Sequence, residues 1–341
     1  MGQPLQTRLK ITFGSSEDDV TQDIMSDFIS FTYDDKEKDE SDEISIELKD
    51  EEGKWAGQWR PDGGEIVTAY IYPGTIREQT ASLYCGKFYV DEFSISGSPS
   101  KCTISAISVP LSTPIRRKMK TRAWEKKKLE DIANEIAEDA ELSLMFDSEI
   151  NPEYDRIEQN RESDLKFLAK ICEEAGCSIK VTDEKLVIFD QESYEKKDPI
   201  KTFTLGMSDI KSWSFSASQG ETYKSCEVKY RDPKSREVNS YTYEDPDVDE
   251  ENGQEYSLKI RAKSKDEAER LAKAKLRKLN LRKVTGSMTL IGDAELVSGS
   301  VIECSGFGSI DGNFIIENAT HKVDSSGYST TVNLRRVNSN F

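Results

Sequence analysis

Alternating apolar and polar residues dominate the first 112 positions of the chain. Five segments alternate with a period of two and are separated by Gly, Pro, Asp and Ser: 29–33, 43–48, 65–72, 86–96 and 101–109. Successive side chains of a strand point to opposite faces, so this period predicts strands with one buried face. Several short strands at this spacing predict a small barrel or sandwich over residues 1–112.

A helical period replaces the alternation in residues 113–200. In segment 124–140 the apolar side chains fall on one face of a helix. A second helix is expected to begin at Ser163, a suitable N-cap, and to end at Gly176, a suitable C-cap. Residues 178–189 then predict a hairpin. We therefore expect a small α/β domain of two helices and a hairpin.

Strand-like alternation returns in residues 201–341, and one helix interrupts it. Ser264 and Glu267 have the spacing of a capping box, and an apolar stripe follows them, which predicts a helix over 264–281. We expect this helix to lie across the second β domain. The predicted fold class is α+β, mainly β, with a small α/β domain between two β domains.

Composition narrows the possible partners of the chain. The formal net charge of the 341 residues is −17, and 33% of them are charged. Such a surface repels nucleic acid and anionic membranes, so sequence-specific nucleic-acid binding is not expected. No apolar run approaches the roughly 20 residues of a membrane span, and the first residues lack the apolar stretch of a signal peptide. We therefore expect the chain to be synthesised in the cytoplasm and not to be anchored in a membrane.

Three stretches concentrate charge. The acidic runs 34–43 and 244–255 lie between predicted strands and are interpreted as solvated loops. By contrast, segment 263–283 holds nine basic and three acidic residues. An exposed helix face whose long side chains cover apolar surface is the favoured interpretation. The alternative is a contact with an acidic patch of a neighbouring subunit, with a possible subunit interface formed by Lys273, Lys275 and Arg277.

The sequence holds little that predicts chemistry. None of the six cysteines forms a Cys-x-x-Cys pair, so no metal site is predicted and buried reduced thiols are expected. A catalytic triad would need His321, for instance with Asp324, but no nucleophile elbow lies nearby and a structural histidine is favoured. Trp55 and Trp59 can bind sugar in principle, although loop-anchoring aromatics are commoner. No catalytic, cofactor-binding or metal residue is predicted, and no cofactor.

One motif near the middle of the chain is more specific. It reads Gln-x-x-Glu-Ser-Asp-Leu-x-Phe-Leu and follows an expected helix led by Arg122 and Trp124. Its residues are Gln159, Glu162, Ser163, Asp164, Leu165, Phe167 and Leu168. The C-terminal strands add His321 and Gly327, among others. Together these segments resemble the phage late control D family, the hub proteins of contractile tails.

The motif itself has a structural interpretation. Ser163 can cap a helix, and Asp164 is favourable at the positive N-terminal end of that helix. Leu165, Phe167 and Leu168 then pack inward. These residues specify a fold and not a reaction, so Trp124, the motif, His321 and Gly327 are taken as structural positions.

The resemblance implies a structural, non-enzymatic baseplate hub subunit of a contractile injection particle. Relatives form homotrimers in which each subunit supplies two tube-like β-barrels, so that three subunits match a hexameric tail tube on one side and a three-fold central spike on the other. The implied partners are the tail tube protein, the central spike protein, and other baseplate and tape-measure proteins. A tail-tip cell-wall hydrolase and a carbohydrate-binding module are the alternatives. The particle can be a phage, a bacteriocin or another injection system.

Overall fold

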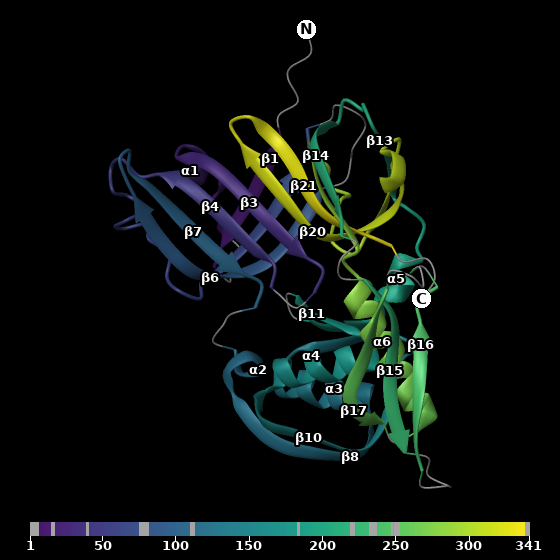
Figure 1. Ribbon diagram of the computed structural model, residues 1–341. Coiled ribbons are helices and arrows are strands. Elements are labelled where there is room, and N and C mark those ends of the chain that lie inside the picture. Colours follow the sequence, from purple (N-terminus) through teal and green to yellow (C-terminus); the bar gives the residue numbers. More distant parts are fainter. Residues whose placement is uncertain are drawn as a thin grey trace.

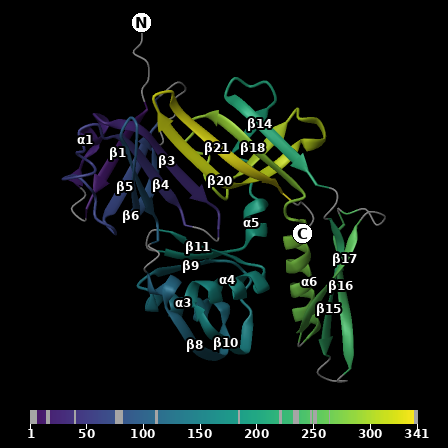
Figure 2. The same cartoon turned by 60° about the vertical axis from the view of Figure 1, so that its left-hand side comes forward.

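Figure 1 shows a computed structural model of the chain, with a layer of long strands above two smaller units. The structure describes residues 7–14, 18–38, 41–74, 82–109, 113–182, 185–218, 222–231, 237–246, 248, 253–262 and 264–337. The turn of the hairpin expected at 178–189 lies outside these residues at positions 183–184. The two lower units lie side by side beneath the strand layer (Figure 2).

The N-terminal part of the upper layer contains the strands that the alternation predicts. They are β1 (Arg8–Phe13), β2 (Asp18–Asp19), β3 (Phe28–Lys36), β4 (Glu43–Lys49), β5 (Ile66–Tyr72), β6 (Leu83–Ser96) and β7 (Lys101–Ile107), with one short helix α1 (Thr21–Met25). Every second residue of β4 and β7 is buried. The apolar faces of these strands form one hydrophobic cluster, so the period of two correctly identifies the inward face.

The C-terminal part of the layer has its own cluster. Its elements are β13 (Lys201–Thr204), β14 (Ile210–Ala217), β18 (Val284–Ile291), β19 (Val301–Ser305), the 3-10 turn η1 (Gly308–Ile310), β20 (Gly312–Asp324) and β21 (Gly327–Arg336). Between β19 and β20 the backbone turns at Gly306, which has a φ of +83°.

Both ends of the chain share one 13-stranded sheet. Its main order is β14-β18-β21-β20-β3-β4-β7-β6-β5-β1-β2, and β19 and β13 extend it from β20. The joint is the antiparallel pair β20–β3, in which His321 lies opposite Tyr33. This order is an open path, so the described strands do not show the closed barrels expected from the sequence.

The middle unit contains α2 (Pro114–Arg117), β8 (Met119–Lys128), α3 (Leu129–Asp139), β9 (Ser143–Asp147), β10 (Glu153–Ser163), α4 (Asp164–Ala175), β11 (Ser178–Thr182), β12 (Lys185–Phe189) and α5 (Gln191–Glu195). The hairpin β11–β12 and both ends of α4 are confirmed: Gly176 adopts a φ of +94°. The prediction of a helix over 124–140 is wrong for residues 124–128, which belong to a strand. Arg122 and Trp124 lie on strand β8, which pairs with β10, and α3 begins only where the apolar stripe begins.

A separate unit lies beside the middle one. It consists of β15 (Tyr223–Arg231), β16 (Val238–Glu244), β17 (Gln254–Ala262) and α6 (Lys265–Asn280), with the predicted N-cap Ser264. The stripe Ala268, Leu271, Ala272 and Leu276 packs on Cys226 and Val228 of β15. The helix therefore covers its own three-stranded sheet and contacts α4; it does not lie across the C-terminal strands as expected.

The cysteines behave as predicted. All six, at positions 85, 102, 172, 177, 226 and 304, are buried, and none of them forms a disulfide bond. Burial raises the pKa of Cys102 to about 12, so its thiol stays protonated and packs as a small apolar group. In the described part of the chain, no helix is long and apolar enough to cross a membrane.

Candidate functional site at the junction of the units

The family-motif residues lie where β10 passes into α4. Gln159 is fully buried; its Oε1 accepts a hydrogen bond from Nε of Arg122 at 2.9 Å, and its Nε2 donates to Oδ1 of Asp164 at 2.9 Å. Asp164 also forms ion pairs with Arg122 at 2.8 Å and Lys120 at 2.7 Å. These contacts fasten α4 to the β8–β10 ribbon, because a buried carboxylate needs partners on all sides.

The other motif residues cap the N-terminus of α4 or pack against the core of the middle unit. Ser163 accepts a hydrogen bond from the Lys166 backbone at 3.4 Å, which confirms the predicted N-cap. Phe167 is buried and stacks on Trp124, with ring centroids 5.1 Å apart. Leu168 is buried too, Leu165 is half-buried, and Glu162 pairs with Lys170 at 3.6 Å. All of these contacts hold the middle unit together.

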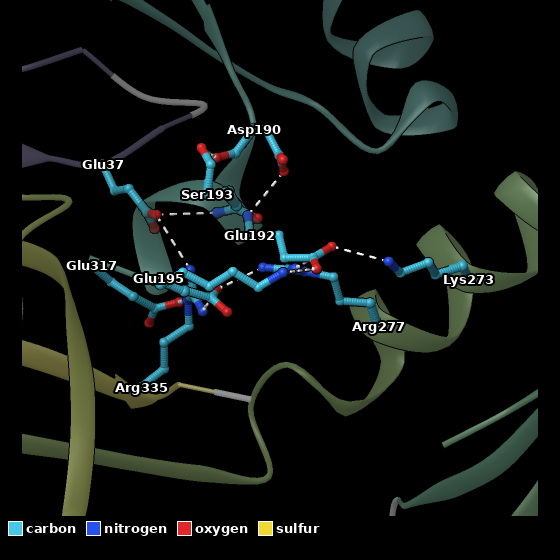
Figure 3. Close-up of polar contacts among 11 residues, drawn as sticks. Glu37, Asp190, Glu192, Ser193, Glu195, Lys273, Arg277, Glu317 and Arg335 are labelled. Carbon is cyan, nitrogen blue, oxygen red and sulfur yellow. Dashed lines mark hydrogen bonds and ion pairs between the residues drawn. The ribbon is translucent and has the colours of Figure 1, made fainter. Parts of the chain in front are cut away.

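A second set of charges gathers around the short helix α5, between the upper sheet and α6 (Figure 3). Arg335 of β21 is 0% exposed and forms ion pairs with Glu195 of α5 and with Glu37, which follows β3. Its Nε lies 3.4 Å from Oε1 of Glu317 on β20. One arginine from the last strand thus contacts carboxylates from three separate parts of the chain.

The other side of α5 binds α6. Glu195 also accepts from Nη2 of Arg277 at 2.7 Å, and Glu192 pairs with Lys273 at 3.1 Å. Gln191 donates from its Nε2 to Glu37 at 3.1 Å. In both views of the fold, α5 lies below the upper sheet and next to α6. This short helix therefore connects the upper sheet, the middle unit and the α6 unit through polar contacts.

Burial and charge oppose each other in this cluster. Burial favours the neutral form of Arg335, but the neighbouring carboxylates of Glu37 and Glu195 outweigh it and raise the pKa of the guanidinium. Burial also raises the pKa of Glu37, and Arg335 only partly offsets that effect. Each charge is therefore tolerated because its partner is present, and removal of one partner leaves the other buried without compensation.

A similar cluster fastens the middle unit to β3 and β4. Lys180 of β11 lies 2.9 Å from Asp35 and 3.1 Å from Asp42. Asp35 also accepts hydrogen bonds from the backbone and the hydroxyl of Ser298, both at 2.7 Å. Burial raises the pKa of Asp42 to about 6, although Lys180 opposes this shift.

These contacts correct the interpretation of the acidic run 34–43 as a solvated loop. Asp35, Glu37 and Asp42 are buried and bind groups that lie far along the chain. Charge density alone cannot reveal such partners. In the second run, 244–255, Asp245 is also buried and accepts a hydrogen bond from Asn280 at 2.6 Å; much of that run lies outside the described residues.

The basic residues considered for a subunit interface make contacts inside the chain. Lys273 and Arg277 face α5 as described above, and Nζ of Lys275 lies 5.2 Å from the centre of the Tyr256 ring. On the same helix Lys278 pairs with Glu173 of α4. Pairing within the chain therefore accounts for Lys273, Arg277 and Lys278 of the basic face.

His321 lies in the β20–β3 joint. It is fully buried, its Nδ1 lies 2.8 Å from the hydroxyl of Tyr328, and its ring stacks on Tyr33. Burial lowers its pKa to about 4. Asp324 instead accepts from the Ser326 backbone at 2.7 Å, so the pair considered for a triad does not form. Gly327, with a φ of +108°, follows the turn at Ser325 and Ser326 and begins β21.

Other candidate positions are structural as well. Trp55 is buried and donates from its Nε1 to Asp27 at 2.8 Å, so it anchors its loop; Trp59, 40% exposed, packs edge-on against it. Over the described residues, no group of three or more His, Cys, Asp or Glu side chains is placed to hold a metal ion. The sequence did not predict the contacts of Arg335, Glu37 and Lys180. The basic pair Arg335-Arg336 at the end of β21 is a signal for Arg335 alone.

The fold is similar to that of solved prophage tail proteins. The 43 kDa tail protein of prophage MuSo2 from Shewanella oneidensis superimposes with a TM-score of 0.73 at 13% identity, covering 98% of this chain and 100% of that one. Two probable baseplate hub proteins are similar in sequence. That of Escherichia phage 186 is 25% identical (98% of this chain, 94% of that protein), and that of Escherichia phage P2 is 26% identical (93% and 90%).

The family follows from a match to a family model. The model of the phage tail baseplate hub (GPD) family matches residues 78–327, and the chain belongs to this family. The resemblance drawn from the Gln159–Leu168 motif is thereby confirmed. The protein is a structural baseplate hub subunit and part of a phage-tail particle.

Proposed function

We propose that this hub subunit assembles as a homotrimer and joins the hexameric tail tube of a contractile particle to its three-fold central spike. The observation that supports this proposal is the shared sheet: strands of the N-terminal and C-terminal ends lie side by side, joined by β20 and β3. One chain then offers two β units, and three chains offer six to a six-fold partner.

We infer that these two β units are tube-like and span residues 1–112 and 201–341, with residues 113–200 as the α/β domain between them. Separate hydrophobic clusters under the N-terminal and C-terminal strands support two units. Within 201–341, the sheet β15–β17 and α6 have a further cluster of their own and form an arm beside the middle domain.

The role is architectural and not enzymatic. The charged side chains that the structure brings together are paired with one another, and their contacts link separate units of the fold. Partners in this proposal are the tube and spike proteins, together with other baseplate and tape-measure proteins. The chain is made in the bacterial cytoplasm and then incorporated into the particle.

Mass measurement of purified complexes tests this function. The chain is mixed with the tube protein and the spike protein encoded with it, and the masses of the complexes are determined in solution. We expect three copies of this chain per complex, with both partners bound. A chain that binds neither partner, or that cleaves cell-wall glycan when purified alone, contradicts the proposal.

A further inference from the structure

The outward face of strands β1, β5 and β6 reverses the charge of the chain. The whole sequence holds 64 acidic residues against 47 basic ones. On this face, the side chains that point away from the hydrophobic cluster are basic, aromatic or neutral, and none of those in the described ladders is acidic. They are Arg8, Lys10, Thr12, Ile66, Thr68, Tyr70, Tyr72, Tyr84, Lys87 and Tyr89.

The basic and tyrosine side chains are neighbours across the strands. Arg8 lies opposite Tyr72 and Lys10 opposite Tyr70 in the β1–β5 ladder, and Tyr70 lies opposite Tyr84 of β6. The rings of Tyr70 and Tyr84 have centroids 4.9 Å apart, and Nζ of Lys10 lies 5.8 Å from the centre of the Tyr70 ring. We call Arg8, Lys10, Tyr70, Tyr72 and Tyr84 the basic–tyrosine face.

This face does not contribute to the hydrophobic core of its unit. The alternate residues of the same strands, such as Leu9 and Ile71, form the core cluster, while Arg8 and Lys10 are exposed and Tyr84 is 48% exposed. Strand propensity explains a single outward tyrosine. Three tyrosines beside two cations instead have the composition of an interface, where Tyr and Arg carry much of the binding energy.

The basic–tyrosine face lies far from the β14 end of the sheet. In the strand order, β5 and β1 come next to β2 at one end and β14 stands at the other, and Figure 2 shows the two groups on opposite sides of the upper layer. At the margin of the face, Asp19 of β2 lies opposite Thr12. Hydrogen bonds with Thr21 and, to a smaller extent, the charge of Lys10 lower the pKa of Asp19. Lys10 therefore already favours a carboxylate at this margin.

The spacing of the two cations indicates the chemistry of a partner. Arg8 and Lys10 are alternate residues of one strand, so their side chains leave the same face about 7 Å apart. Carboxylates at alternate positions of an extended segment have the same spacing, and a guanidinium can bind a carboxylate through two hydrogen bonds. Most of a chain with a net charge of −17 repels such a segment, so attraction is confined to the basic–tyrosine face.

We propose that the basic–tyrosine face binds an extended acidic segment of a different protein. Carboxylates at alternate positions of that segment pair with Arg8 and Lys10, and its remaining side chains cover the rings of Tyr70, Tyr72 and Tyr84. This binding site goes beyond the proposed hub function, which does not depend on it.

Peptide binding to the full-length chain tests the site. The probe is a fluorescently labelled peptide of four Glu-Thr repeats, its matched control is a peptide of four Gln-Thr repeats, and fluorescence anisotropy measures both affinities. Arg8→Glu/Lys10→Glu reverses the two cations, and Tyr70→Ser/Tyr84→Ser removes two rings. Lys229→Glu/Lys259→Glu changes the net charge equally at exposed positions of β15 and β17, outside the face. Far-UV circular dichroism checks that each variant is folded.

We expect the wild type to bind the Glu-Thr peptide at least about tenfold more tightly than the Gln-Thr peptide, and added salt to weaken this binding. Arg8→Glu/Lys10→Glu should lose at least about tenfold in affinity and Tyr70→Ser/Tyr84→Ser several-fold, whereas Lys229→Glu/Lys259→Glu should bind like the wild type.

Four results overturn the site. They are a wild type that does not bind the Glu-Thr peptide, an equal loss of affinity in Lys229→Glu/Lys259→Glu, tighter binding of a single-stranded oligothymidylate than of the peptide, and a change in the self-association of the chain in Arg8→Glu/Lys10→Glu. The third result assigns the face to nucleic acid, and the fourth assigns it to a second copy. Each of them leaves the hub function standing, because the masses of complexes with tube and spike proteins test that function separately.

Discussion

Arg335 and Glu195 lie 140 positions apart in the sequence and form an ion pair that is almost completely buried. The pair connects the last strand of the sheet to a five-residue helix that also binds α6 through Arg277. Because Glu195 serves both arginines, the orientation of the upper sheet and that of the α6 unit depend on the same carboxylate.

Removal of Arg335 is the most direct test of this junction. Arg335→Ala leaves Glu37 buried without its ion-pair partner and leaves Glu195 with Arg277 alone, so we expect the free energy of unfolding to fall by about 3–5 kcal/mol. Urea denaturation of the purified chain measures the change. Arg282→Ala is the control, because Arg282 is 75% exposed on its side chain and approaches Glu317 only at 3.6 Å; it should change stability by less than about 0.5 kcal/mol. Equal effects of the two substitutions would contradict the proposed importance of burial.

Charge reversal on α6 should act first inside the chain. In Lys273→Glu/Arg277→Glu, two new carboxylates face Glu192 and Glu195, so we expect α6 to separate from α5 while its apolar stripe stays on β15. Hydrogen exchange should become faster in α5 and stay slow in β15. Lys275→Glu serves as the control, since Lys275 lies against Tyr256 and not α5. If the double variant leaves exchange in α5 unchanged and blocks association instead, these residues form a subunit interface.

His321 predicts a dependence of stability on acid. Burial lowers the pKa of His321 from 6.5 to about 4 in the folded chain, so the unfolded chain takes up the proton first. The contribution of the neutral ring is complete above pH 6.5 and is lost progressively as the pH falls toward 4, by about 3 kcal/mol in total. His321→Gln lacks this titration. The difference in unfolding free energy between wild type and variant should therefore shrink from pH 7 to pH 4; a constant difference rules out the shift.

The family motif should be sensitive at its polar positions. Asp164→Ala removes the carboxylate that Arg122, Lys120 and Gln159 share, and we expect a loss of about 3 kcal/mol in stability. Leu165→Ala, at a half-buried position of the same helix, should cost about 1–2 kcal/mol. Thermal unfolding compares the two. A smaller loss at Asp164 than at Leu165 would mean that packing alone, and not the polar network, holds α4 to β8 and β10.

The parts of the fold that follow from local patterns could be predicted from sequence. Alternation identified the strands of the upper layer, and Ser163 with Gly176 fixed the ends of α4 because caps are local. Trp124 was assigned to a helix because β8 is followed directly by α3, and the β8 sequence, MKTRAWEKKK, has too few apolar residues to show an alternation. The ion pairs around α5 could not be predicted from the sequence, because Glu37, Glu195 and Arg335 become neighbours only through the tertiary fold.

The pairing of β3 with β20 also determines when the protein can finish folding. Nearly 300 residues separate the two strands, so a chain emerging from the ribosome completes its first sheet only after its last strands have been synthesised. Contacts of such long sequence separation slow folding. Before β20 pairs with β3, the backbone groups on that edge of β3 are unpaired and can bind other strands. A nascent or truncated chain that lacks the final hairpin is therefore vulnerable to aggregation at β3.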